Sequence, residues 1–358
     1  MNPTLDLSEI NQKIGPLFIA GMPGPEIDDF TISMIKDYHL GGIILFKRNI
    51  IEPVQLARMC RDIQRLSMKH SGVPMFLAID QEGGRVARLK EPFTQFPGNA
   101  AIGENPFPKE SALHFATTTA REMSLVGLNM NLAPVLDIAQ RDIEAHLAGR
   151  CFSSEPSLVA KLGKIVINTL QQGRIMAVAK HFPGLGKANL DPHLNLPTIE
   201  APLEELESIH LIPFAGAIEV DVSAIMSSHA VYPALDPGIP ATLSRKIMTD
   251  LLRKKMQFDG LVISDDLEMG AISNERGLPQ GVLDAFGAGV DLILICKDQT
   301  HIINSMELIR DKLLRGDISH ERLERSLERI ALYKKRFLYP LKKVYIKAVR
   351  EYFKTLQV

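Results

Sequence analysis

GLVISDD, at residues 260–266, is one of eight short apolar runs in this chain of 358 residues. Each run is rich in Ile, Val, Leu, Phe or Met and is bounded by Gly, Pro or charged residues, which is typical of parallel strands buried on both faces. The other seven are GPLFIAGM (15–22), GGIILFK (41–47), PMFLAIDQEGG (74–84), NMNLAPVLDI (129–138), AVAKHFPG (177–184), AIMSSHAVYP (224–233) and DLILIC (291–296).

Helical patterns separate most of these runs. Apolar residues recur at three- and four-residue spacing over residues 53–68, 109–125 and 158–173. Eight strand–helix repeats predict an α/β fold, a single (β/α)8 TIM-type barrel. An open doubly wound sheet uses the same alternation, but the count of eight and the lack of a Gly-rich dinucleotide fingerprint after the first run favour the barrel. We expect a catalytic barrel over residues 1–339 and a C-terminal amphipathic helix over residues 340–358.

The composition excludes several classes of protein. With 46% hydrophobic and 23% charged residues, the chain can bury a large core and is not intrinsically disordered. It has neither an apolar run near the ~20 residues of a membrane span nor a signal-peptide pattern at its start, so we expect no membrane association. Its three cysteines are scattered singly, which fits neither a disulfide framework nor a zinc site and favours the cytoplasm. The net charge of −1 gives no general attraction for nucleic acid.

The near-zero net charge hides a basic C-terminus. Residues 334–358 contain eight Lys or Arg and one acid, so they carry +7 while the preceding chain carries −8. Apolar residues at helical spacing form one stripe of the expected tail helix: Leu341, Val344, Tyr345, Ala348, Tyr352 and Phe353. We expect this stripe to dock on the acidic barrel or on a second subunit, and binding to an anionic membrane is the alternative.

Polar residues end several of the apolar runs, and the active site of a barrel lies at the C-terminal ends of its strands. A single such residue is often a helix cap or a rim ion pair, but residues from four strands point to a functional rim. These strand-end residues are Asp80, Glu82, Arg85, Arg88, Lys180, His181, His229, Asp265 and Asp266.

Two further features bear on the chemistry. Asp265 can act as a nucleophile, a base or a metal ligand, and the adjacent Asp266 faces the opposite way in an extended strand, so we expect one of the two at most to be catalytic. On the Gly-containing segment after the fifth run, Asp191 and His193 are two residues apart and can form an acid/base pair. Spacing alone slightly favours the alternative, an Asx-type turn with an exposed histidine.

Four motifs resemble, in order and spacing, the bacterial β-N-acetylglucosaminidases (β-hexosaminidases) of glycoside hydrolase family 3. They are DQEGGRVAR (80–88), KHFPG (180–184), D-x-H (191–193) and SDDLxM (264–269), and the similarity runs from about residue 15 to residue 332. The resemblance implies an exo-acting, retaining hydrolysis of terminal β-linked N-acetylglucosamine through a covalent intermediate. It implies Asp265 as nucleophile and His193, partnered by Asp191, as acid/base. The sugar-binding residues that it implies are Asp80, Arg88, Arg150, Lys180 and His181.

The sequence departs from the family pattern at two loop positions, where Leu185 replaces a histidine and Pro192 a serine; Arg150 also lies in a looser motif than usual. The family's usual role predicts a carbohydrate substrate from peptidoglycan recycling in the cytoplasm. No set of His, Asp and Glu has the spacing and strand-end placement of a hydrolytic metal site, so we expect no metal. We also expect no cofactor, no nucleic acid partner, and a monomer or homodimer.

Three other functions compete with this hypothesis. A histidine acid/base tolerates an incoming anion, so the chain can be an N-acetylglucosaminide phosphorylase. Lys180 on the fifth strand suggests a Schiff-base aldolase. The changes at Leu185 and Pro192 suggest a sugar-binding barrel that has lost catalysis.

Overall fold

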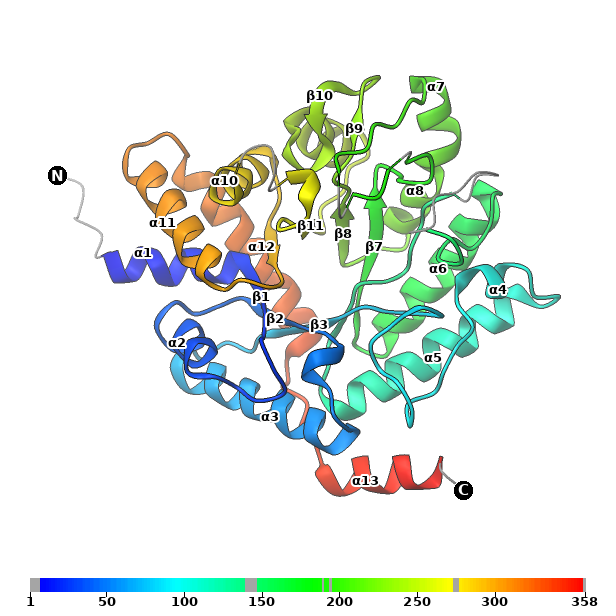
Figure 1. Cartoon of the computed structure of the whole chain (residues 1–358), viewed down its shortest axis with the longest axis vertical. Coiled ribbons are helices and arrows are strands. Elements are labelled where there is room, and N and C mark those ends of the chain that lie inside the picture. Colours follow the sequence, from blue (N-terminus) through cyan, green and yellow to red (C-terminus); the bar gives the residue numbers. More distant parts are fainter. Residues whose placement is uncertain (1–6, 139–146, 189, 193–194, 273–276, 357–358) are drawn as a thin grey trace.

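The computed structural model describes residues 7–138, 147–188, 190–192, 195–272 and 277–356. Its centre is a closed parallel barrel in which β1 pairs with both β12 and β2, so no edge strand remains (Figure 1). Around the ring the strands follow chain order: β1 (Phe18–Gly21), β2 (Gly42–Leu45), β3 (Phe76–Ile79), β6 (Met130–Asn131), β7 (Met176–Phe182), β8 (Ala224–Ser227), β11 (Leu261–Asp266) and β12 (Leu292–Ile295). The predicted barrel is confirmed and the open sheet is excluded.

Helices surround the barrel (Figure 1). Those of the first half are α1 (Leu7–Ile14), α2 (Asp29–Asp37), α3 (Pro53–His70), α4 (Asn99–Gly103), α5 (Pro108–Val126) and α6 (Pro156–Gln172). Those of the second half are α7 (Leu203–Glu205), α8 (Ile212–Glu219), α10 (Leu278–Ala288), α11 (Thr300–Leu314), α12 (His320–Leu338) and α13 (Ile346–Thr355), with π-helical segments at Leu206–His210 and Lys246–Lys255. Short 3-10 turns cover Gly15–Leu17, Lys47–Asn49 and Ala241–Leu243.

The helices predicted from apolar spacing agree with α3, α5 and α6 to within two residues at each end. Most barrel strands are buried along their whole length, as all seven residues of β7 are, which explains why they appear in the sequence as unbroken apolar runs. Two hairpins, β4 (Gln81–Gly83) with β5 (Val86–Ala87) and β9 (Val231–Tyr232) with β10 (Asp236–Pro240), follow the C-terminal ends of β3 and β8. No helix in the described part of the chain combines the length and apolarity needed to cross a bilayer.

The C-terminal tail packs on this chain's own barrel, where α13 contacts α3 and α5 (Figure 1). The Phe353 ring meets the Phe93 ring edge-on with centroids 4.5 Å apart, and the Tyr352 hydroxyl donates to Glu122 Oε1 at 3.2 Å. Val349 is completely buried. Docking on the barrel, rather than projection into solvent, is therefore what the structure shows for this helix.

The predicted apolar stripe of the tail is wrong in part. The helix begins at Ile346, and residues 341–345 have no helical conformation, so helical spacing does not apply to them. Leu341 and Tyr345 are consequently 37% and 65% exposed, and Ala348 is exposed as well. The buried face is made by Val349 and Phe353, with Tyr352 half-buried.

We predict that Phe353→Ala lowers the free energy of unfolding by about 3 kcal/mol, because it removes a buried aromatic ring and leaves a cavity against Phe93. Tyr345→Ala, an aromatic truncation at an exposed site of the same tail, should change it by no more than about 0.5 kcal/mol. Chemical denaturation of both variants checks this. Equal losses would contradict the docking of α13 through its Val349–Phe353 face.

Candidate active site

A cavity of about 370 Å³ opens at the C-terminal end of the barrel. Its lining includes seven of the eight residues that the sequence singles out for the site: Asp80, Arg88, Arg150, Lys180, His181, Asp191 and Asp265. The eighth, His193, lies outside the residues that the structure describes. Polar residues at or near the C-terminal ends of the barrel strands β3, β7 and β11 thus meet in one small space with residues of the neighbouring loops, as expected for a barrel.

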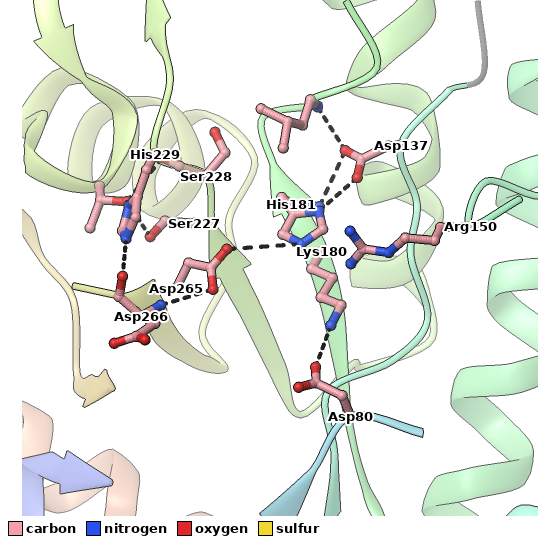
Figure 2. Close-up of polar contacts among 12 residues, drawn as sticks. Asp80, Asp137, Arg150, Lys180, His181, Ser227, Ser228, His229, Asp265 and Asp266 are labelled. Carbon is pink, nitrogen blue, oxygen red and sulfur yellow. Dashed lines mark hydrogen bonds and ion pairs between the residues drawn. The ribbon is translucent and has the colours of Figure 1, made fainter. Parts of the chain in front are cut away.

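The floor of this cavity is a buried ionic network centred on Lys180 (Figure 2). The Lys180 ammonium lies 2.8 Å from Asp80 Oδ1 and 2.7 Å from Glu82 Oε1, and it is only 3% exposed. The Arg150 guanidinium donates two hydrogen bonds of 2.8 Å to the Glu82 carboxylate, and Arg88 Nη2 lies 3.2 Å from Asp80 Oδ2. Because every ion has a partner of opposite charge, the network is tolerated in the barrel interior.

The network keeps all of these groups ionised. Burial raises the pKa of both the Asp80 and the Glu82 carboxyl. At Asp80, Lys180 and Arg88 outweigh burial, and at Glu82, Lys180 and Arg150 do so. Both pKa values therefore lie below the ordinary range. Burial lowers the pKa of Lys180, but the two carboxylates more than compensate and raise it. A protonated, doubly paired ammonium is not a nucleophile, so the Schiff-base aldolase does not fit this site.

His181 is held by Asp137, a residue that the sequence analysis missed. Asp137 Oδ2 lies 2.7 Å from His181 Nδ1, and Asp137 Oδ1 accepts hydrogen bonds from the backbone N–H groups of His181 and Leu185 at 3.3 and 2.7 Å. Burial raises the pKa of Asp137, but His181 outweighs it and the pKa is lowered. Asp137 ends the apolar run NMNLAPVLDI, so the strand-end rule that selected Asp80 and Asp265 would have selected it too.

Held in this way, the His181 ring directs Nε2 toward Asp265, whose Oδ2 lies 4.0 Å away (Figure 2). Burial raises the pKa of the Asp265 carboxyl, but the neighbouring His181, His229 and Lys180 outweigh burial and hold the pKa below its ordinary value. The Asp266 N–H also donates to Asp265 Oδ1 at 2.8 Å. Asp265 is therefore an ionised carboxylate that faces the cavity.

Asp266 faces away from the cavity, as the alternation of side chains along a strand requires. Its Oδ1 accepts hydrogen bonds from the backbone N–H groups of Glu268 and Cys296 at 3.1 and 3.3 Å. Burial raises its pKa to about 6. His229, buried after β8, places Nε2 3.1 Å from the Asp266 carbonyl oxygen and supports the backbone on which both aspartates lie (Figure 2). Of the two aspartates, Asp265 lines the cavity and Asp266 does not.

The loop after β7 contributes Leu185, Asp191 and Pro192 to the cavity lining. Leu185 and Pro192, the two departures from the family pattern, thus both border the site. The loop is supported from outside by Lys187, whose ammonium lies 2.8 Å from Glu205 Oε1, and by His210, which is packed beneath Gly184. Within the described ranges, no group of three or more His, Cys, Asp or Glu residues is arranged to hold a metal ion.

Fold and site together define a barrel enzyme with an ionised carboxylate in a small, cation-lined cavity. The model of the glycosyl hydrolase family 3 N terminal domain matches residues 9–332. A beta-hexosaminidase from Pseudomonas aeruginosa (strain LESB58) is 35% identical over 266 residues, covering 74% of this chain and 78% of that protein. Beta-hexosaminidase A from Pseudoalteromonas piscicida is 32% identical over 333 residues, covering 87% of this chain but 55% of that longer protein, so the chain spans just over half of its length.

Solved structures agree with the sequence matches. A glycoside hydrolase family 3 beta-N-acetylglucosaminidase from Paenibacillus sp. str. FPU-7 superposes with a TM-score of 0.90 at 35% identity, covering 98% of this chain and 68% of that one. The chain therefore belongs to glycosyl hydrolase family 3. It is a glycoside hydrolase of the β-hexosaminidase type, as the four motifs predicted.

We predict that Asp137→Asn lowers kcat on the order of 10- to 100-fold, because the neutral amide no longer orients the His181 ring beside Asp265. Steady-state kinetics at a temperature where the variant is folded, with unfolding followed in parallel, check this. Loss of stability with unchanged kcat would instead give Asp137 a purely structural role.

Proposed function

We propose that this protein is an exo-acting, retaining β-N-acetylglucosaminidase that removes terminal β-linked N-acetylglucosamine from peptidoglycan-recycling fragments in the cytoplasm. The observation that carries the proposal is the placement of the ionised Asp265 carboxylate in one small cavity with groups that can hold sugar hydroxyls, Asp80, Arg88 and Lys180. The beta-hexosaminidases among its relatives support the choice of an N-acetylated sugar.

The size of the cavity supports exo action. At about 370 Å³ it lies near the lower limit of ligand pockets, which suits one sugar ring rather than several consecutive ones. A ring held on its hydroxyls by Asp80 and Lys180 presents its anomeric carbon toward Asp265 and leaves the aglycone outside. Binding and bond cleavage are then performed by different residues.

In the first step, the Asp265 carboxylate attacks the anomeric carbon while the glycosidic oxygen leaves with a proton. A covalent glycosyl ester and the free alcohol result. We propose that His193, with Asp191 as its partner, donates this proton; Asp191 lines the cavity. His181, His229 and Lys180 hold the pKa of Asp265 below its ordinary value and so favour the ionised nucleophile before attack.

In the second step, the same histidine removes a proton from water, which attacks the anomeric carbon and releases Asp265. Two inversions give net retention of the β configuration. The ordinary pKa of imidazole, about 6.5, suits a group that must both donate and accept a proton near neutral pH.

The first test traps the intermediate. Wild-type protein treated with a fluorinated N-acetylglucosaminide should become labelled at Asp265, and NMR should show the β-anomer as the first product. Asp265→Ala should lower kcat at least about a thousandfold while leaving sugar binding measurable. Asp266→Asn is the matched control, since its amide oxygen can still accept from Glu268 and Cys296, and it should lose far less activity. Labelling of Asp266 would refute the assignment.

The second test concerns the acid/base. His193→Ala should slow substrates with poor alkyl leaving groups by about 10²- to 10⁴-fold, and activated aryl N-acetyl-β-glucosaminides much less, because only the former need a proton in the transition state. Equal losses for both substrates would make His193 structural. Analysis of the products with added phosphate distinguishes hydrolysis from phosphorolysis, since only the latter yields a sugar 1-phosphate.

The third test is the pH profile of kcat/KM. Asp265 must be ionised to attack, and its pKa is lowered, so its acidic limb should lie below about pH 4, the ordinary range of an aspartate. Activity should therefore persist as the pH falls until that limb is reached. An inflection near pH 6 that disappears in Asp266→Asn would assign it to Asp266, whose pKa is raised by burial. Such a result would contradict control of the acidic limb by Asp265.

A further inference from the structure

A second and larger cavity, of about 880 Å³, lies at the opposite end of the barrel. It is bounded by α3, by the segments that lead into β6 and β7, and by the tail between α12 and α13. Leu128 and Asn129 precede β6 and Arg174 precedes β7, so the cavity lies at the N-terminal ends of these strands. The site around Asp265 lies at their C-terminal ends, and the two cavities share no lining residue.

Five cationic side chains line this second cavity, and no acidic side chain appears among its described lining residues: Arg61, Arg65, Arg174, Lys342 and Lys343. Arg61 and Arg65 share one neighbouring carboxylate, Asp62, at 3.0 and 3.4 Å. Two cations with one anion leave this edge of the cavity positive.

The remaining cations are bound to neutral partners or to none. Arg174 donates to the backbone carbonyl oxygens of Phe337, Tyr339 and Pro340, and Lys342 donates to the Ser124 hydroxyl. Across the described ranges, Lys343 forms no ion pair. Burial, followed by the nearby Arg174, lowers the pKa of Lys342, as expected for a cation among like charges. An anion in the cavity would relieve this repulsion.

The rest of the lining is largely apolar. Met68, Leu128, Phe337, Leu338 and Leu341 contribute hydrocarbon surface. Gln64 and Asn129 also line the cavity, but both use their amides on backbone groups around Met75 and Leu77. A small hydrophilic anion would therefore leave most of the cavity wall without a matching surface. A molecule with one anionic end and a hydrocarbon chain satisfies both parts.

We propose that this cavity is a binding site for a single-chain anionic amphiphile, the class to which long-chain carboxylates belong. Its anionic group lies among the Arg65, Arg174 and Lys343 cations, and its chain lies along the Leu128, Phe337 and Leu338 surface. The occupant is a monomeric molecule rather than a bilayer, because the cavity lies between the tail and the barrel and its volume of about 880 Å³ is within the range of sites for single small molecules. This inference is independent of the proposed glycosidase.

The test uses dodecanoate below its micellar concentration, with isothermal calorimetry of the full chain. We expect saturable binding with one dodecanoate per chain. 1-Dodecanol, which lacks the charge, and butanoate, which lacks the long chain, should each bind at least about tenfold more weakly. Turnover of an aryl N-acetyl-β-glucosaminide by the same preparation is measured in parallel, so failure of one proposal is distinguishable from failure of the other.

Two variants localise the binding. Lys343→Glu in the Arg65→Glu background should weaken dodecanoate binding at least about tenfold, because two lining cations become anions. Lys347→Glu is the control for Lys343→Glu: it makes the same charge change as that single substitution on the same tail, at a side chain that is 90% exposed and does not line the cavity. It should bind dodecanoate within about twofold of wild type.

Three results would overturn the proposal. They are absence of saturable dodecanoate binding, an equal loss in Lys347→Glu and in the double variant, and binding to vesicles of anionic phospholipid without binding of monomeric dodecanoate. The last result would assign the basic tail to a membrane surface. Circular dichroism of each variant confirms that a loss of binding does not reflect loss of the fold.

Discussion

The buried ammonium of Lys180 is the constraint on which the site depends. It lies within 2.8 Å of two carboxylates, Asp80 and Glu82, and Glu82 in turn holds Arg150 through two hydrogen bonds. These contacts join the end of β3, the middle of β7 and the segment before α6 into one rigid floor. Removal of Lys180 would take one of two cationic partners from each of the buried Asp80 and Glu82 carboxylates, and the loss of one partner of a buried ion pair typically costs about 3–5 kcal/mol.

The same charge has a chemical consequence. With His181 and His229, Lys180 holds the pKa of Asp265 below its ordinary value, even though burial acts in the opposite direction. The network that stabilises the barrel mouth therefore also keeps the proposed nucleophile ionised. Asp137, which does not line the cavity, adds to this arrangement by fixing the ring of His181.

The two ends of the barrel have different electrostatic designs. At the C-terminal end, cations and carboxylates are paired around a small polar cavity, which suits recognition of hydroxyl groups and stabilisation of charge during bond cleavage. At the N-terminal end, the tail borders a larger space where cations outnumber carboxylates among the described lining residues and hydrocarbon covers most of the wall. Positive charges that are paired with carboxylates of the protein hold side chains in position, whereas positive charges without such partners favour the binding of an external anion.

The sequence by itself determined the barrel, since eight strands buried on both faces must be apolar throughout. It also determined that Asp265 and Asp266 cannot point to the same face, since side chains alternate along a strand. It also placed polar residues at the strand ends. It did not show that Arg150 pairs with Glu82, which is 68 residues away, or that Asp137 holds His181. The helical phase of the tail was likewise set by docking, because residues 341–345 follow the barrel surface before α13 begins. Local periodicity depends on neighbouring residues in the chain and can be read from them, whereas ion pairing and burial depend on which distant segments the closed barrel brings together.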